Sequence, residues 1–132
     1  MIEDATAGCR ILVVEDEMLI SIDIEDTLKA LGCEVVGPTG KLDTALELAR
    51  GTLDAAILDI TIRGGKVFPV AEELQARGVP FVLSSGYGDW ALPPAFQNLP
   101  RLTKPFTSAE LEEQVRMLCM EASLRGNRKP SA

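Results

Sequence analysis

The strongest structural signal in the chain is RILVVEDE, residues 10 to 17. Its four consecutive apolar residues, 11 to 14, are typical of a strand that is buried on both faces of a parallel sheet. The run ends directly in Glu15, Asp16 and Glu17, three acids with no base between them. Like charges about 4 Å apart repel by roughly 4 kcal/mol near a protein surface, so this cluster needs a compensating partner.

Strand and helix patterns alternate along the rest of the chain. Besides 10–15, strands are predicted over 34–37, 55–59, 79–84 and 101–103. Helical patterns follow them over 20–31, 42–50, 67–74 and from Thr107 onward, where Thr107 and Glu110 have capping-box spacing. This alternation predicts an α/β fold in which helices cover both faces of a parallel sheet. Pro93 and Pro94 limit the fourth connection to one helical turn and irregular chain, in which Phe96 is expected to stay partly exposed.

The composition excludes several classes of function. At 132 residues the chain is expected to form one domain, and its net charge of −7 argues against a nucleic-acid partner. It contains no histidine, which removes a Ser-His-Asp triad, a Cys-His dyad and the usual zinc sites. Cys9, Cys33 and Cys119 have no C-x-x-C spacing and are expected to be free thiols. The chemistry is left to Asp, Glu, Lys and hydroxyl groups.

The N-terminus carries acids where a signal peptide needs bases, and no apolar run approaches the roughly 18 to 20 residues of a membrane span. We therefore expect a cytoplasmic protein with no membrane partner.

Polar residues gather at the predicted carboxyl ends of the strands, where open parallel sheets bind ligands. They are Glu15, Asp16, Asp59, Ser84, Ser85 and Lys104. Carboxylate oxygens suit a hard cation such as Mg²⁺, which would turn the repulsion among the acids into coordination. Lys104 and Ser85 are then placed to contact an anion beside the metal.

The motifs ILVVEDE, AAILDI, FVLSSG and LTKPF occur in that order at these strand ends. Together they resemble the receiver domain of two-component response regulators. The resemblance implies a flavodoxin-like (βα)5 fold with a five-stranded parallel sheet in the order 2-1-3-4-5 and a shortened or irregular fourth helix. It covers residues 9 to 122, between a flexible N-terminus, 1–8, and a flexible basic tail, 123–132.

The resemblance also implies a role for each site residue. Asp59 resembles the aspartate that accepts a phosphoryl group from the phosphohistidine of a sensor histidine kinase. Glu15 and Asp16 resemble the acidic pair that holds Mg²⁺ or Mn²⁺ together with Asp59 and the backbone carbonyl of Thr61. Ser85 resembles the switch hydroxyl. Lys104 resembles the lysine that pairs with the phosphorylated aspartate, and its bond to Pro105 is expected to be cis.

The chain departs from the common receiver pattern in two places. Arg63 stands where receivers usually have a proline, and Arg101 stands where they have an aromatic switch residue. The segment PFVLSSGYG instead resembles the FATGUY-type single-domain receivers, with Tyr87 as the candidate switch residue.

The expected function is that of a stand-alone receiver in a phosphorelay, not a turnover enzyme. It would act on an effector protein, or as a sink or relay of phosphoryl groups with a histidine phosphotransferase. One alternative is a pseudo-receiver, an interaction module that keeps the fold without phosphorylation. Another is a phosphatase of the haloacid dehalogenase type, but Thr61 occupies the position of its acid-base aspartate. Asp16 could instead cap the first helix, and Asp59 could be a turn residue.

Overall fold

The computed structural model describes residues 5–86 and 92–125. Its main sheet has five parallel strands: β1 (Arg10–Val14), β2 (Glu34–Thr39), β3 (Ala55–Asp59), β6 (Phe81–Ser85) and β7 (Arg101–Thr103). They are ordered β2-β1-β3-β6-β7, and each neighbouring pair is parallel. Counted along the main sheet alone, this is the order 2-1-3-4-5, so the flavodoxin-like prediction is confirmed.

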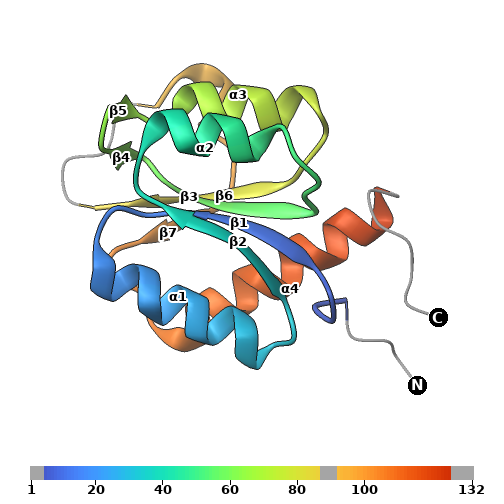
Figure 1. The fold of residues 1–132 in the computed structure, drawn as a ribbon. Coiled ribbons are helices and arrows are strands. Elements are labelled where there is room, and N and C mark those ends of the chain that lie inside the picture. Colours follow the sequence, from blue (N-terminus) through green and yellow to red (C-terminus); the bar gives the residue numbers. More distant parts are fainter. Residues whose placement is uncertain (1–4, 87–91, 126–132) are drawn as a thin grey trace.

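Over the described residues, four helices form the outer layers of the fold. They are α1 (Met18–Ala30), α2 (Leu42–Ala49), α3 (Phe68–Ala76) and α4 (Ser108–Leu124). Figure 1 shows α2 and α3 on one face of the sheet and α1 and α4 on the other. Each layer buries its own core, one around Leu58 and Leu74 and the other around Ile57 and Leu111. Adjacent strand residues therefore pack in opposite cores, as the pleat of a strand requires.

The ends of the helices follow local signals in the sequence. At the start of α4, the Thr107 side chain accepts from Glu110 N and the Glu110 side chain accepts from Thr107 N, so the predicted capping box is confirmed. Gly32 follows α1 with φ +84°, a left-handed conformation that glycine adopts without steric cost.

The fourth connection contains one 3-10 turn, η1 (Pro94–Phe96), which begins at the second of two prolines. Phe96 is 2% exposed, so the expectation that it stays partly exposed was wrong. Its ring stacks on Phe68 at a centroid distance of 5.8 Å and meets Phe81 edge-on at 6.2 Å. These contacts anchor the irregular connection to the core under α3.

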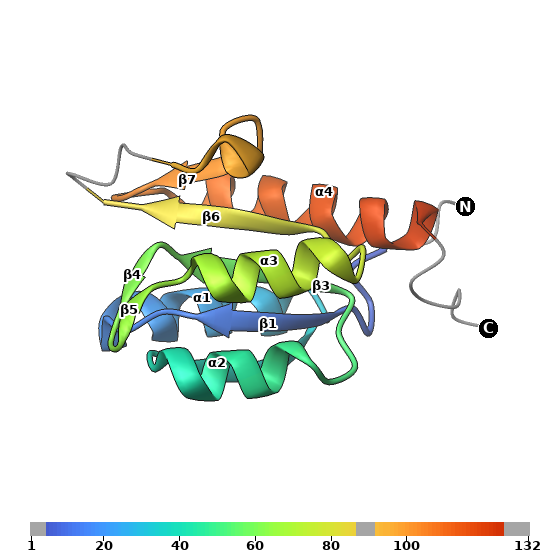
Figure 2. The same ribbon diagram turned by 90° about the horizontal axis from the view of Figure 1, so that it is seen from above.

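Some boundaries differ from the sequence prediction. The edge strand β2 extends to Thr39, beyond the predicted end at Gly37, and it includes Pro38, which an edge strand tolerates. A short antiparallel hairpin, β4 (Thr61–Ile62) and β5 (Gly65–Lys66), was not predicted. Figure 2 shows it at the end of the sheet toward which the arrows of β1 and β6 point. Two residues per strand are too few to give an alternating pattern.

The described N-terminal residues pack against the end of α1. Thr6 is 1% exposed, and its Oγ1 donates to Leu31 O at 2.7 Å. Gly8 N donates to Gly32 O at 2.8 Å. Both residues lie ahead of the boundary at residue 9 that the resemblance suggested. Within the described ranges, the structure has no helix with the length and apolar character needed to cross a membrane.

Candidate functional site

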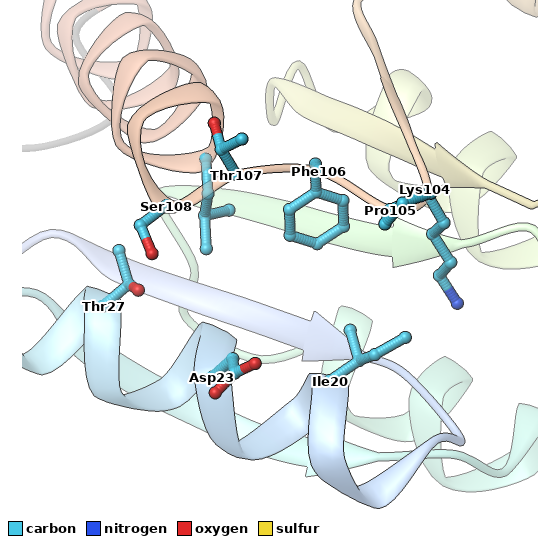
Figure 3. A pocket seen from close by; sticks show the side chains of 9 residues that line it. Ile20, Asp23, Thr27, Lys104, Pro105, Phe106, Thr107 and Ser108 are labelled. Atoms are coloured by element: carbon cyan, nitrogen blue, oxygen red, sulfur yellow. The ribbon is translucent and has the colours of Figure 1, made fainter.

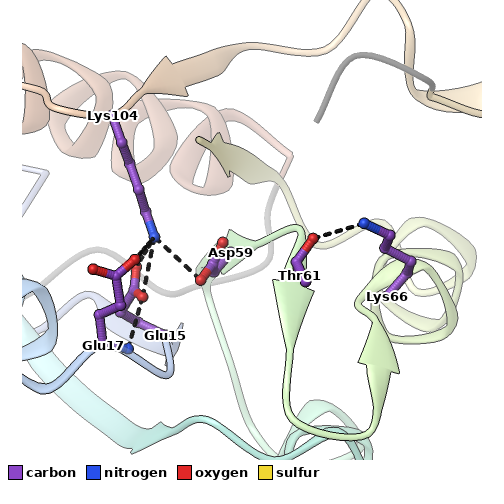
Figure 4. Close-up of polar contacts among 6 residues, drawn as sticks. All are labelled: Glu15, Glu17, Asp59, Thr61, Lys66 and Lys104. Atoms are coloured by element: carbon purple, nitrogen blue, oxygen red, sulfur yellow. Dashed lines mark hydrogen bonds and ion pairs between the residues drawn. The ribbon is translucent and has the colours of Figure 1, made fainter. Parts of the chain in front are cut away.

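Two buried carboxylates and a partly buried lysine meet at the carboxyl edge of the sheet (Figure 4). Glu15 directly follows β1, Asp59 is the last residue of β3, and Lys104 directly follows β7. Glu15 is 3% exposed and Asp59 is 4% exposed. The parallel topology thus brings together residues that are up to 89 positions apart in the sequence.

Lys104 is the cation that holds this group of carboxylates together. Its Nζ lies 3.2 Å from Asp59 Oδ2, 3.0 Å from Glu15 Oε1 and 3.3 Å from Glu17 Oε1. The Lys104 side chain is 13% exposed, so water screens its contacts with the buried Glu15 and Asp59 only weakly. One lysine therefore compensates three acids of which two are buried.

Burial and the neighbouring charges shift the pKa values of Asp59 and Lys104. Burial and the neighbouring charge of Glu15 raise the pKa of Asp59 from 3.8 to about 8, although Lys104 acts in the opposite direction. Burial alone would lower the pKa of Lys104, but the hydrogen bond to Glu15 and the charge of Asp59 raise it. Lys104 stays charged, and Asp59 holds a proton near neutral pH until another cation arrives.

The acidic residues fit a divalent cation. Glu15, Asp16 and Asp59 each offer one oxygen, and these oxygens lie within 4.8 Å of one another. Among the residues that the structure describes, none donates a hydrogen bond to the buried Glu15 Oε1, which forms an ion pair with Lys104 Nζ at 3.0 Å. A carboxylate oxygen in an all-oxygen cluster is the type of ligand that a hard ion such as Mg²⁺ would bind.

The position of Asp16 also bears on the capping alternative. The N-cap residue of α1 is Glu17, and it makes no side-chain capping bond. Asp16 belongs to the carboxylate cluster. The helix-capping alternative for Asp16 is therefore not supported.

Gly40 shapes the site without contributing a side chain. A Cβ atom built on Gly40 would lie 2.7 Å from Asp16 Cα and 2.8 Å from Asp16 Cβ. A larger residue would therefore displace the chain that carries Asp16. Sequence reasoning missed Gly40, because a glycine between β2 and α2 also fits an ordinary turn.

The remaining predicted site residues lie around this edge. Thr61 starts β4, and its Oγ1 accepts from Lys66 Nζ at 2.8 Å, as Figure 4 shows. Ser85 ends β6 with 4% exposure, and its carbonyl accepts from Lys104 N at 2.8 Å. Tyr87 lies outside the described residues. Sequence reasoning did not single out Lys66, which β5 brings beside Thr61.

Arg63 explains one departure from the receiver pattern. Its N–H donates to Gly40 O at 3.0 Å, and its carbonyl accepts from Leu42 N at 2.9 Å. A proline has no N–H and could not make the first bond. In this chain the segment after Asp59 is tied to the loop that passes Asp16.

A small pocket adjoins the site between α1 and the start of α4 (Figure 3). It encloses about 180 Å³ and is lined by residues that include Ile20, Asp23, Lys104, Pro105 and Phe106. The bond between Lys104 and Pro105 is cis, which confirms that prediction.

The family assignment rests on similarity to known proteins with the same fold. SdrG from Sphingomonas melonis Fr1 is 40% identical, with a TM-score of 0.72 over 88% of this chain and 97% of that chain. The receiver domain of the sensor histidine kinase PA1611 from Pseudomonas aeruginosa PAO1 is 26% identical, with a TM-score of 0.68 over 86% of this chain and 99% of that chain. That structure has a magnesium ion coordinated in the active-site cleft.

The chain belongs to the response-regulator receiver family. Its sheet order and its strand-end acids agree with that assignment. The transcriptional regulatory protein PdtaR from Mycobacterium tuberculosis is 29% identical over 113 residues, or 82% of this receiver chain. The receiver chain spans 55% of the length of that curated relative. No family model matches the sequence.

Proposed function

We propose that this receiver accepts a phosphoryl group on Asp59 from the phosphohistidine of a sensor histidine kinase. The observation that carries the proposal is the convergence of a buried aspartate, a lysine 3.2 Å from its Oδ2, and two further carboxylates within 4.8 Å. A turn residue at a strand end needs none of these partners. The arrangement is that of a nucleophile beside positive charge.

In the transfer, an Asp59 carboxylate oxygen attacks phosphorus, the P–N bond of the phosphohistidine breaks, and the leaving imidazole takes up a proton. Mg²⁺ held by Glu15, Asp16 and Asp59 would neutralise charge on the transferred group. We assign the Thr61 carbonyl as a further metal ligand. Mn²⁺ has the same preference for oxygen ligands.

Lys104 has a second role in this proposal. Its Nζ already contacts Asp59 Oδ2, so a short movement would bring it to an oxygen of the attached phosphoryl group. Charge-assisted hydrogen bonds of this kind are roughly twice as strong as neutral ones. Ser85, at the tip of β6, would supply the switch hydroxyl, and Tyr87 would be the residue that responds to it.

The output of such a receiver is a protein interaction. We propose a downstream effector or a histidine phosphotransferase as the next partner, and the protein would not turn over a substrate. We also propose that the chain is a receiver of the FATGUY type, as the segment around Ser85 suggests.

The test is incubation with acetyl phosphate and Mg²⁺, followed by intact mass and phosphate release. A phosphorylated receiver gains one acid-labile phosphoryl group. A phosphatase releases phosphate continuously, and a pseudo-receiver does neither. No mass gain in the wild type, with Mg²⁺ present, would overturn the proposal.

A further inference from the structure

β6 ends in two serines, and the proposed function uses only the second. Ser84 is 1% exposed, and its Oγ is a buried atom without a hydrogen-bond partner in the part of the chain that the structure describes. Burying a hydroxyl without a partner opposes folding. Its position therefore calls for a ligand that arrives after folding.

The sheet register places Ser84 beside the phosphoacceptor. Asp59 and Ser84 are partners on the parallel strands β3 and β6. In-register neighbours project to the same face of a sheet, and Ile57 and Val82, two residues earlier on each strand, both pack in the core under α1 and α4. Glu15 follows Val14, the strand partner of Leu58, so it flanks Asp59 from the β1 side. Ser84 flanks it from the β6 side.

Ser85 does not duplicate this position. It is the next residue along β6, so its side chain leaves the strand on the opposite face. Leu83, with the same alternation as Ser85, packs in the core under α2 and α3. Two hydroxyls therefore approach the carboxyl edge from different sides.

In the structure, Lys104 already forms an ion pair with the Asp59 carboxylate, with Nζ 3.2 Å from Oδ2. Phosphorylation would add negative charge and three strong acceptor oxygens at this point. We propose that the Ser84 hydroxyl donates a hydrogen bond to the phosphorylated Asp59 side chain and so acts as a second positioning hydroxyl. This inference rests on the proposed function, and the ligand it concerns is an acyl phosphate.

The probe is beryllofluoride, a phosphoryl mimic, titrated into the full chain with saturating Mg²⁺. Ser84→Ala should bind it about threefold to tenfold more weakly, the range expected for the loss of one hydrogen bond. Its affinity for Mg²⁺ alone should not change, because the hydroxyl serves the anion. Its unfolding midpoint without ligands should not fall, because no existing bond is lost.

Thr6→Val is the matched control, because it removes a hydroxyl that is buried and already paired with Leu31 O at 2.7 Å. It should lower the unfolding midpoint and leave beryllofluoride affinity unchanged. Ser84→Ala overturns the inference if it binds the mimic within about twofold of wild type, or if it loses as much stability as Thr6→Val. If the wild type does not bind the mimic, or Asp59→Asn binds it equally, the proposed function itself fails.

Discussion

At the level of single residues, the acids of the site carry more negative charge than Lys104 balances when no metal is bound. Glu15 and Asp59 are buried, and Lys104 is the cation that contacts both. A buried carboxylate without enough positive charge is stabilised by a proton instead. That makes the stability of the metal-free protein depend on the protonation of Asp59.

The first prediction follows from the raised pKa of Asp59, about 8 against an ordinary 3.8. The folded protein holds this proton more tightly than the unfolded chain, so stability falls as pH rises from about 4 to about 8 and then levels. Asp59→Asn should flatten that fall and raise the melting temperature near neutral pH by roughly 5 °C or more. Urea denaturation in a chelator across this pH range measures it.

The control is Asp54→Asn, which removes a carboxylate at the opposite end of the sheet that accepts from Arg10 N at 2.8 Å. This variant should not raise the melting temperature near neutral pH, because the Asp54 carboxylate already accepts a hydrogen bond. An unchanged slope in Asp59→Asn would contradict the account of the site.

The second prediction concerns Lys104. Lys104→Ala leaves Glu15 and Asp59 buried without their cation, and removing one partner of a buried ion pair typically costs about 3 to 5 kcal/mol. Added Mg²⁺ should restore part of that loss, because the metal would supply the missing charge. Chemical denaturation with and without Mg²⁺ measures both effects.

Lys29→Ala is the control, since Lys29 forms an exposed pair with Glu25 one turn away on α1. Its loss should change the stability far less than the loss of Lys104, because water and salt screen an exposed pair. If Lys104→Ala costs no more than Lys29→Ala, then Lys104 does not balance the buried acids.

The sequence was enough to predict which charged residues meet, because each directly ends or follows a strand of a parallel sheet. It was not enough to find Gly40, where an added Cβ atom would lie only 2.7 Å from Asp16 Cα. Nor did it distinguish the environments of Ser84 and Ser85, which depend on the register of β6 against β3. Such features come from tertiary contacts between distant segments.

At the scale of elements, the long strands and helices could be predicted because their burial has a clear period. The stripes on α1 and α3 were visible in the sequence, and Ile24 and Leu74 are both fully buried. The β4–β5 hairpin could not be predicted, since its order depends on bonds to another loop. Arg63 makes those bonds to Gly40 and Leu42.

The third prediction tests that attachment. Arg63→Pro removes the N–H that donates to Gly40 O at 3.0 Å, so it should destabilise the protein by about 1 kcal/mol or more. Arg63→Ala keeps the N–H and should cost less than about 0.5 kcal/mol. Denaturation midpoints compare the two. Equal stability of the proline and alanine variants would show that the bond does not hold the hairpin.

At the scale of the whole molecule, the fold and the metal are linked. The loop after β1 brings Glu15 and Asp16 to the cluster and β3 brings Asp59, so the cluster exists only when the sheet is assembled. A cation that binds the folded chain alone stabilises it by mass action. We therefore expect metal binding to raise the free energy of unfolding of the whole domain.

The fourth prediction is that Mg²⁺ at about 100 times its dissociation constant stabilises the protein by about 2.7 kcal/mol. Asp16→Asn should lose this effect, because Asp16 is part of the acidic cluster. Asp43→Asn, an exposed acid in the first turn of α2, should keep it. Thermal unfolding at increasing Mg²⁺ is the measurement. An equal rise in melting temperature for Asp16→Asn would place the bound metal elsewhere.

Chemical mapping of the phosphorylated residue decides whether Asp59 is the phosphoacceptor. Borohydride reduces an acyl phosphate on aspartate to homoserine, which peptide mass spectrometry locates in the sequence. After treatment with acetyl phosphate and Mg²⁺, we expect homoserine at position 59 alone and none in Asp59→Asn. Homoserine at another aspartate, or phosphorylation that persists in Asp59→Asn, would contradict this expectation.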